Sequence, residues 1–229
     1  MNKLSVTMSR RETILGWCYY AFQMLALQFL IEYACILFDF PLTLLSLNVI
    51  YFCVNFFCLT VLLFSFLRRS IAAAAEEWKR TLKFAFRGFL VYWALNIFVY
   101  NMILRLSPGY FNMNDSTIGT MAQGNFPLLV FCTVVLAPVA EELVFRGLIF
   151  QGLYNKNRIL AYLVSTLAFS SIHVLPYLGA MQPLHMLLSV LQYVPAGLAL
   201  GWAYAKSDTI CAPILIHMFI NFLGTFALR

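Results

Sequence analysis

Hydrophobic residues dominate seven long stretches of this chain, and shorter polar or charged connections separate them. The stretches cover about residues 14–38, 42–67, 88–106, 126–150, 159–178, 184–205 and 209–228. A helix of about 20 apolar residues spans the hydrocarbon core of a bilayer and satisfies its own backbone hydrogen bonds there. The pattern therefore predicts an all-α, polytopic bundle of about seven transmembrane helices. An eighth span or a re-entrant segment would move the C-terminus to the other side of the membrane.

The composition agrees with this pattern, because 62% of the 229 residues are hydrophobic and only 10% are charged. Soluble domains carry about 25% charged residues, so the composition excludes an ordinary water-soluble fold and predicts a lipid bilayer as the surrounding medium. The net charge of +6 arises from Lys and Arg beside the apolar stretches, which favours membrane orientation over nucleic-acid binding. The six cysteines form no CxxC pair and indicate neither a disulfide framework nor a zinc knuckle.

Basic residues are concentrated in alternate connections between the apolar stretches. They are Lys3, Arg10, Arg11, those of the stretch 68–87, Lys156, Arg158 and Lys206. The positive-inside rule therefore predicts a multi-pass protein of the cell membrane with a cytoplasmic N-terminus. The basic stretch 68–87 predicts an amphipathic helix at the membrane interface. The stretch 107–125, which is polar and rich in Gly and Asn, predicts a loop.

Two adjacent glutamates and one arginine lie inside the fourth apolar stretch, where a charged side chain costs at least ~2.5 kcal/mol. They are Glu141, Glu142 and Arg146. On a helix, Arg146 lies about 40° around the axis from Glu142 but about 140° from Glu141, so we expect Glu142 and Arg146 to pair. Glu141 then faces elsewhere as a buried carboxylate outside the ion pair. Such a group suits a general base that activates water.

Two further stretches supply polar partners for these carboxylates. The fifth contains Phe169 and His173 in the sequence FSSIH, and the seventh contains His217 and Asn221 in the sequence HMFIN. The four-residue spacing places His217 and Asn221 on one helical face, at a depth similar to that of Glu141. His173 lies deeper unless its helix begins late. Each residue alone is more typical of packing, but their combination indicates a site.

The motifs EExxxR, FxxxH and HxxxN occur in this order on successive hydrophobic segments, and together they resemble the CPBP family. This family comprises the CAAX proteases and bacteriocin-processing enzymes and is also called the Abi family. The resemblance covers about residues 126–226, and the short chain favours a small bacterial member. It divides one integral membrane domain into residues 1–125, with N-terminal membrane helices, the amphipathic segment and the loop, and a catalytic core at residues 126–229.

The resemblance implies an intramembrane endopeptidase with a site in the cytoplasmic half of the membrane. Its substrate would be a membrane-associated or prenylated peptide or protein, in bacteriocin maturation or self-immunity. The implied catalytic residues are Glu141, Glu142, Arg146, His173, His217 and Asn221. By position, Glu141 with His173 would activate water, and His217 with Asn221 would stabilise the oxyanion, while the ion pair would hold the site.

Several alternatives remain open at the level of sequence. A Glu/His/His set is compatible with zinc, but HExxH is absent, and a metal-free glutamate mechanism is equally compatible. A non-enzymatic bacteriocin immunity or binding protein would carry the same motifs. No Asp lies in an apolar stretch, which excludes a two-aspartate protease, and no GxSxG-like turn surrounds the serines near His173. A proton-coupled transporter would require matching polar positions in the first half.

Overall fold

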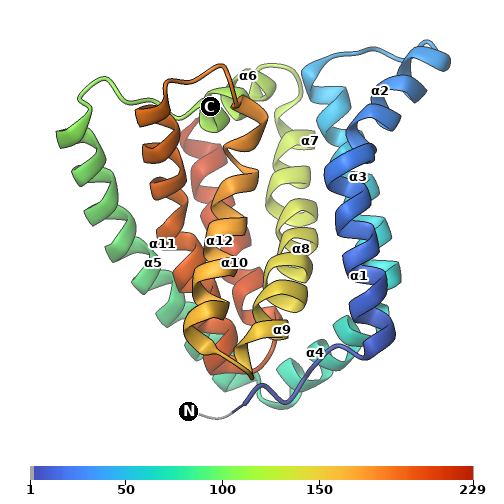
Figure 1. Cartoon of the computed structure of the whole chain (residues 1–229), viewed down its shortest axis with the longest axis vertical. Coiled ribbons are helices and arrows are strands. Elements are labelled where there is room, and N and C mark those ends of the chain that lie inside the picture. Colours follow the sequence, from blue (N-terminus) through green and yellow to red (C-terminus); the bar gives the residue numbers. More distant parts are fainter. Residues whose placement is uncertain (1–2, 229) are drawn as a thin grey trace.

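The computed structural model describes residues 3–228, and all regular secondary structure in this range is helical (Figure 1). The N-terminal part contains α1 (Arg10–Phe22), η1 (Gln23–Leu27), α2 (Gln28–Leu37), α3 (Leu44–Leu62), α4 (Phe64–Glu76), α5 (Trp78–Leu106) and α6 (Met113–Ala122). The C-terminal part contains α7 (Phe126–Phe131), η2 (Cys132–Leu136), α8 (Ala137–Glu142), η3 (Leu143–Phe150), α9 (Gln151–Tyr154), α10 (Arg158–Ile172), η4 (Leu175–Tyr177), α11 (Pro183–Ser207) and α12 (Cys211–Ala227). The prediction of an all-α fold is confirmed.

Each of the seven apolar stretches forms a helix. Five helices are long and apolar enough to cross a membrane, namely Arg10–Leu37, Leu44–Leu62, Trp78–Leu106, Phe126–Tyr154 and Pro183–Ser207. Two apolar helices are shorter, Arg158–Ile172 and Cys211–Ala227. The long helices lie side by side in one bundle, with the N-terminus and α4 at one end and the C-terminus and α6 at the other (Figure 1). The chain is thus a multi-pass membrane protein.

The helix Phe126–Tyr154 is the most enclosed part of the bundle. Of its most apolar window 61% is buried, against 11% for each of the helices Leu44–Leu62 and Trp78–Leu106. Large apolar side chains cover the outside, and Leu25 and Phe38 are 76% and 78% exposed. Such an apolar exterior is matched to lipid and not to water. The core is therefore organised around the helix that carries both glutamates.

The backbone of this central helix is π-helical on each side of α8. The π-helical segments η2 and η3 bracket the glutamate pair, and π-bulges occur frequently at functional sites. The hydroxyl group of Ser165 on α10 donates to the carbonyl oxygen of Phe145 in η3 at 2.8 Å. A second helix thus compensates the irregular backbone, as a membrane interior requires.

Helices α10 and α11 approach closely at Gly197. A Cβ atom at this position would lie 2.6 Å from Cγ2 and 3.0 Å from Cα of Thr166, which is too close for any side chain. The contact holds the two helices against each other along the length that leads to His173. Glycine is therefore required at this position by the helix packing.

The N-terminal segment crosses one end of the bundle and is bonded to the first residue of α9 and to the connection after this helix. The amide of Leu4 donates to Oδ1 of Asn155 at 2.9 Å, and the amide of Met8 donates to Oε1 of Gln151 at 2.8 Å. Gln151 Nε2 donates in return to the carbonyl oxygen of Val6 at 2.9 Å. These bonds cover the end of the bundle where the basic connections lie.

The prediction of a loop for residues 107–125 is wrong over Met113–Ala122, which form α6. Asn112 caps this helix, because its Oδ1 accepts from the amides of Asn114 at 2.8 Å and Asp115 at 3.3 Å. The composition is typical of loops, but the cap and bonds to α11 stabilise a helix. The expected interfacial helix at 68–87 is divided, since the chain bends at Glu77 between α4 and α5.

Candidate active site

Glu142 and Arg146 form the expected ion pair in the centre of the bundle. Arg146 Nη1 donates to Glu142 Oε1 at 2.8 Å, and both side chains are fully buried. Arg146 Nη2 also donates to the carbonyl oxygen of Gly197 at 3.3 Å. Buried charges are stable only when they are paired and hydrogen-bonded. The pair therefore fixes the central helix against α11.

His217 is attached to this ion pair from α12. Its Nδ1 atom lies 2.8 Å from Glu142 Oε1, and because a carboxylate only accepts hydrogen bonds, Nδ1 carries the proton. In the neutral imidazole, Nε2 is then the atom with the free lone pair. This Nε2 lies 3.8 Å from Glu141 Oε2.

His173, at the end of α10, has the same orientation relative to Glu141. Its Nδ1 donates to the carbonyl oxygen of Phe169 at 2.8 Å, which assigns the proton to Nδ1. Its Nε2 lies 3.8 Å from Glu141 Oε2. Two imidazole nitrogens from different helices thus face one carboxylate oxygen.

Glu141 Oε2 is buried and has no hydrogen-bond partner among the described residues. A separation of 3.8 Å is too long for a direct hydrogen bond but suits polar groups bridged by one water molecule. The Glu141 side chain is 20% exposed, whereas Glu142 is fully buried. The two adjacent glutamates therefore differ as expected. Glu142 is held in an ion pair, whereas Glu141 keeps one carboxylate oxygen free to bind water.

Phe169, the first residue of the FxxxH motif, forms the apolar floor of the cluster. The Arg146 guanidinium carbon lies 4.6 Å from its ring centre. Its ring also contacts the imidazoles of His173 at 4.9 Å and His217 at 5.5 Å between ring centres. A cation over an aromatic face is stabilised by the ring quadrupole, most strongly where water is excluded.

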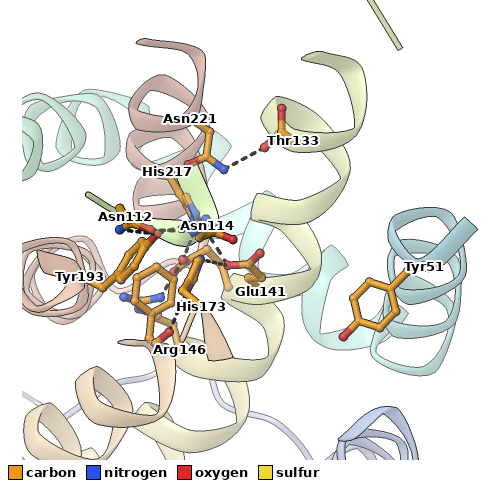
Figure 2. A network of polar contacts seen from close by, with 12 residues as sticks. Tyr51, Asn112, Asn114, Thr133, Glu141, Arg146, His173, Tyr193, His217 and Asn221 are labelled. Carbon is orange, nitrogen blue, oxygen red and sulfur yellow. Dashed lines mark hydrogen bonds and ion pairs between the residues drawn. The ribbon is translucent and has the colours of Figure 1, made fainter. Parts of the chain in front are cut away.

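Asn221 lies one turn beyond His217 on α12, and its amide is directed elsewhere. Its Nδ2 donates to the carbonyl oxygen of Thr133 in η2 at 2.8 Å, away from the carboxylates (Figure 2). This bond uses one of its two N–H groups. The structure thus brings five of the six expected residues into one contact network and places Asn221 at its edge.

Three residues that the sequence analysis did not consider also border the site. The ring of Tyr193 stacks on His173 with centres 4.3 Å apart and planes at 22°. Asn112, which caps α6, and Asn114 in its first turn donate to the Tyr193 hydroxyl group (Figure 2). In the sequence, the polar pair Gln192 and Tyr193 within an apolar stretch is a signal for a buried polar contact. The sequence does not indicate that Asn112 and Asn114 are its partners, because they are about 80 residues away.

Glu32 and His185, two further ionisable residues of the apolar stretches, have their hydrogen bonds elsewhere. Glu32 accepts from Gln28 at 2.9 Å, and His185 lies 3.2 Å from the Ser107 hydroxyl group. Between residues 3 and 228, no group of three His, Cys, Asp or Glu is arranged to hold a metal ion.

A comparison with family models assigns this cluster to a known group. Residues 123–223 match the model described as type II CAAX prenyl endopeptidase Rce1-like. This segment contains all six candidate residues in the expected order. Residues 123–223 therefore belong to the CPBP family.

Curated proteins are also similar to part of the chain. "Putative membrane peptidase YdiL" of Bacillus subtilis is 31% identical over 96 residues, which are 42% of this chain and 35% of that protein. "Membrane-embedded CAAX protease MroQ" of Staphylococcus aureus is 31% identical over 98 residues, covering 42% and 37%. "UPF0177 protein YxdF" of Lactococcus lactis is 26% identical over 114 residues, covering 46% and 54%.

The chain thus spans about a third to a half of the length of these curated relatives. No solved structure matches it significantly. The family-model match covers the helices that carry the site.

Proposed function

We propose that this chain is an intramembrane endopeptidase in which Glu141 activates a water molecule. The observation that supports this most directly is the position of Glu141 Oε2. It is a buried oxygen without a hydrogen-bond partner, and the Nε2 atoms of His173 and His217 both lie 3.8 Å from it. A carboxylate oxygen faced by two imidazole nitrogens is suited to general acid–base chemistry.

In the proposed reaction, Glu141 removes a proton from the bridging water while His173 orients it. The water oxygen attacks the carbonyl carbon of the scissile peptide bond, and the electron pair of the C=O bond moves to its oxygen. The C–N bond of the tetrahedral intermediate then breaks, and the leaving nitrogen takes the proton from Glu141. The C=O bond re-forms as the C–N bond breaks, so the products are a carboxylic acid and an amine, and transfer of one proton between them gives a carboxylate and an ammonium group.

His217 and Asn221 are the proposed donors to the oxyanion. When His217 carries a second proton, Nδ1 donates to Glu142 and Nε2 donates toward the substrate oxygen. With neutral imidazoles, the two carboxylates and one guanidinium of the cluster sum to −1, so one added proton brings it to neutrality. The second N–H group of Asn221 provides a further donor.

The Glu142–Arg146 pair has a supporting role in this proposal. It holds the Nδ1 side of His217 and thereby directs Nε2 toward Glu141. Oriented donors and acceptors contribute to catalysis because they need not reorganise during the reaction. This mechanism proceeds through protein groups, and we propose that a chelator such as 1,10-phenanthroline leaves activity intact. Loss of activity that zinc restores would instead assign a metal to these residues.

We propose a membrane-associated or prenylated peptide or protein as the substrate, in bacteriocin maturation or self-immunity. The names of the relatives support a membrane peptidase of the CAAX type. We further propose that the chain lies in the cell membrane with a cytoplasmic N-terminus, because Lys and Arg are concentrated in alternate connections.

A comparison of peptides released by three variants tests the proposed activity. Cells would express the wild type, Glu141→Gln or Glu32→Gln at matched levels, and peptides from membranes and medium would be measured by mass spectrometry. Glu32→Gln is the matched control, because Glu32 is an intramembrane glutamate bonded only to Gln28 among the described contacts. Peptides that require Glu141 but not Glu32 support the protease. Identical peptide sets in all three strains would contradict it and favour a binding or immunity protein.

A further inference from the structure

Tyr193 connects the candidate site to the segment around α6. Its ring is parallel to the His173 imidazole, with centres 4.3 Å apart and planes at 22°. No other aromatic contact of His173 in the described residues is as close, since Phe169 lies 4.9 Å away at 57°. The imidazole is therefore enclosed by two aromatic rings.

Two asparagines hold the other end of Tyr193. Asn112 Nδ2 and Asn114 Nδ2 donate to its hydroxyl oxygen at 3.2 Å and 3.1 Å. Asn112 Nδ2 also donates to Gln192 Oε1 at 3.0 Å, and Gln192 accepts from the Tyr110 hydroxyl group at 2.7 Å. The start of α6 is thus joined to α11 by a connected set of hydrogen bonds beside the site (Figure 2).

The stacking of Tyr193 on His173 affects how the imidazole ring is oriented. His173 is the C-cap residue that follows α10, and among the described residues its one hydrogen bond runs from Nδ1 to the Phe169 carbonyl. That bond sets the tautomer but leaves the ring able to swing about it. The flat Tyr193 ring opposes this motion and keeps Nε2 directed at Glu141. Small misplacements of a reacting group cost about a hundredfold in rate.

From these contacts we propose that Tyr193 is a positioning residue for His173. Through its hydroxyl group, the segment that carries α6 becomes part of the active site. The inference rests on the proposed function, but the placement of the His173 ring is measurable without turnover. A segment that composition assigns to a loop thus supports the orientation of an intramembrane histidine.

Three variants separate the parts of this proposal. Tyr193→Leu removes the stacking ring, Tyr193→Phe keeps the ring but loses the asparagine bonds, and Asn114→Ala removes one bond from the other side. Trp202→Leu is the matched control, because Trp202 is another aromatic residue of α11 and packs on Phe84 away from the site. Thermal unfolding and gel filtration would first test whether each variant is folded.

The first measurement is chemical modification of His173 by diethyl pyrocarbonate, followed by mass spectrometry. Tyr193→Leu should modify severalfold faster at His173, because one face of the ring is uncovered, while the rate at buried His217 stays unchanged. Tyr193→Phe and Asn114→Ala should give smaller increases, and Trp202→Leu none. A folded Tyr193→Leu protein with the wild-type rate at His173 would overturn the proposal.

The second measurement is hydrolysis of a Glu141-dependent peptide. Tyr193→Leu should lower kcat by at least about tenfold with less than about threefold change in KM. Tyr193→Phe and Asn114→Ala should each lower kcat a few-fold, and their double variant no more than either alone. A change confined to KM would also overturn the positioning role. If no peptide is hydrolysed in a Glu141-dependent manner, the proposed function is contradicted. The modification rates then still test whether Tyr193 positions the His173 ring.

Discussion

His217 donates through Nδ1 to Glu142 at 2.8 Å, and this bond turns its Nε2 toward the neighbouring Glu141. Two consecutive glutamates thus act on opposite sides of one imidazole. The arrangement separates a residue that maintains structure from one that is free for chemistry.

Exchange of each glutamate for glutamine should therefore have different effects. Glu141→Gln should reduce turnover at least about a hundredfold and leave the unfolding temperature unchanged, because its oxygen has no partner to lose. Glu142→Gln should lower both activity and the free energy of unfolding, the latter by about 3 kcal/mol, since Arg146 stays buried without its counter-charge. Thermal unfolding in detergent and peptide hydrolysis measure the two effects. A folded, fully active Glu141→Gln protein would rule out the mechanism.

Gly197→Ala should destabilise the bundle by about 1–3 kcal/mol, because its new Cβ would meet the backbone of Thr166 at 3.0 Å. Gly152→Ala is the control, since no atom lies within 4 Å of a Cβ at that helical position. This control should be neutral or slightly stabilising. Unfolding curves of both variants under one condition provide the comparison. Equal stability of the two would contradict the close approach of α10 and α11.

Asn221→Ala should lower kcat about a hundredfold and change KM little, because an oxyanion donor acts mainly in the transition state. Asn101→Ala is a suitable control, as Asn101 bonds to the carbonyl of Ile97 within its own helix. Steady-state kinetics with a Glu141-dependent peptide separate kcat from KM. An effect of Asn221→Ala on KM alone would contradict the oxyanion role.

Asp115 on α6 should make stability depend on pH. Burial raises the pKa of its carboxyl group from 3.8 to about 6. The folded state therefore favours the protonated form, so its contribution is greatest below about pH 4 and is lost as the pH rises through about 6. Relative to the wild type, Asp115→Asn should gain up to about 3 kcal/mol between pH 4 and pH 7.5. A difference between the two proteins that does not vary with pH would be inconsistent with this shift.

The side of the membrane from which the site is reached can be tested by cysteine labelling. The contacts of His173 and Tyr193 lead to α6, while the N-terminal segment covers the opposite, basic end. A cytoplasmic N-terminus then places α6 outside the cytoplasm, whereas the family resemblance implies a cytoplasmic site.

With the six native cysteines replaced, Ser116→Cys should react with an impermeant maleimide in intact cells. Lys156→Cys at the basic end should react only after permeabilisation. Both positions are exposed. The reverse pattern would place α6 and the approach to the site in the cytoplasm.

Much of this architecture was predictable from local physical rules. The seven apolar stretches predicted the helices, and helical geometry predicted that Glu142 and not Glu141 pairs with Arg146. These inferences hold because bilayer thickness and helix periodicity act on neighbouring residues.

The remaining features depend on contacts between distant segments. The stacking of Tyr193 on His173 joins α11 to α10, and Asn112 reaches it from a third part of the chain. The residues of α6 favour a turn by composition. The Asn112 cap and the hydrogen bond to α11 stabilise the helical conformation instead. Neither contact leaves a periodic signal in the sequence.

Helix α10 contains 15 residues, and a helix of this length extends only about 22 Å. The hydrocarbon core of a typical bilayer is about 30 Å thick, so the membrane beside α10 must become thinner, or head groups and water must descend to the helix end. His173 is the residue at that end. In the proposed mechanism, local deformation of the lipid would bring water to this histidine, and we expect acyl-chain length to affect the reaction rate.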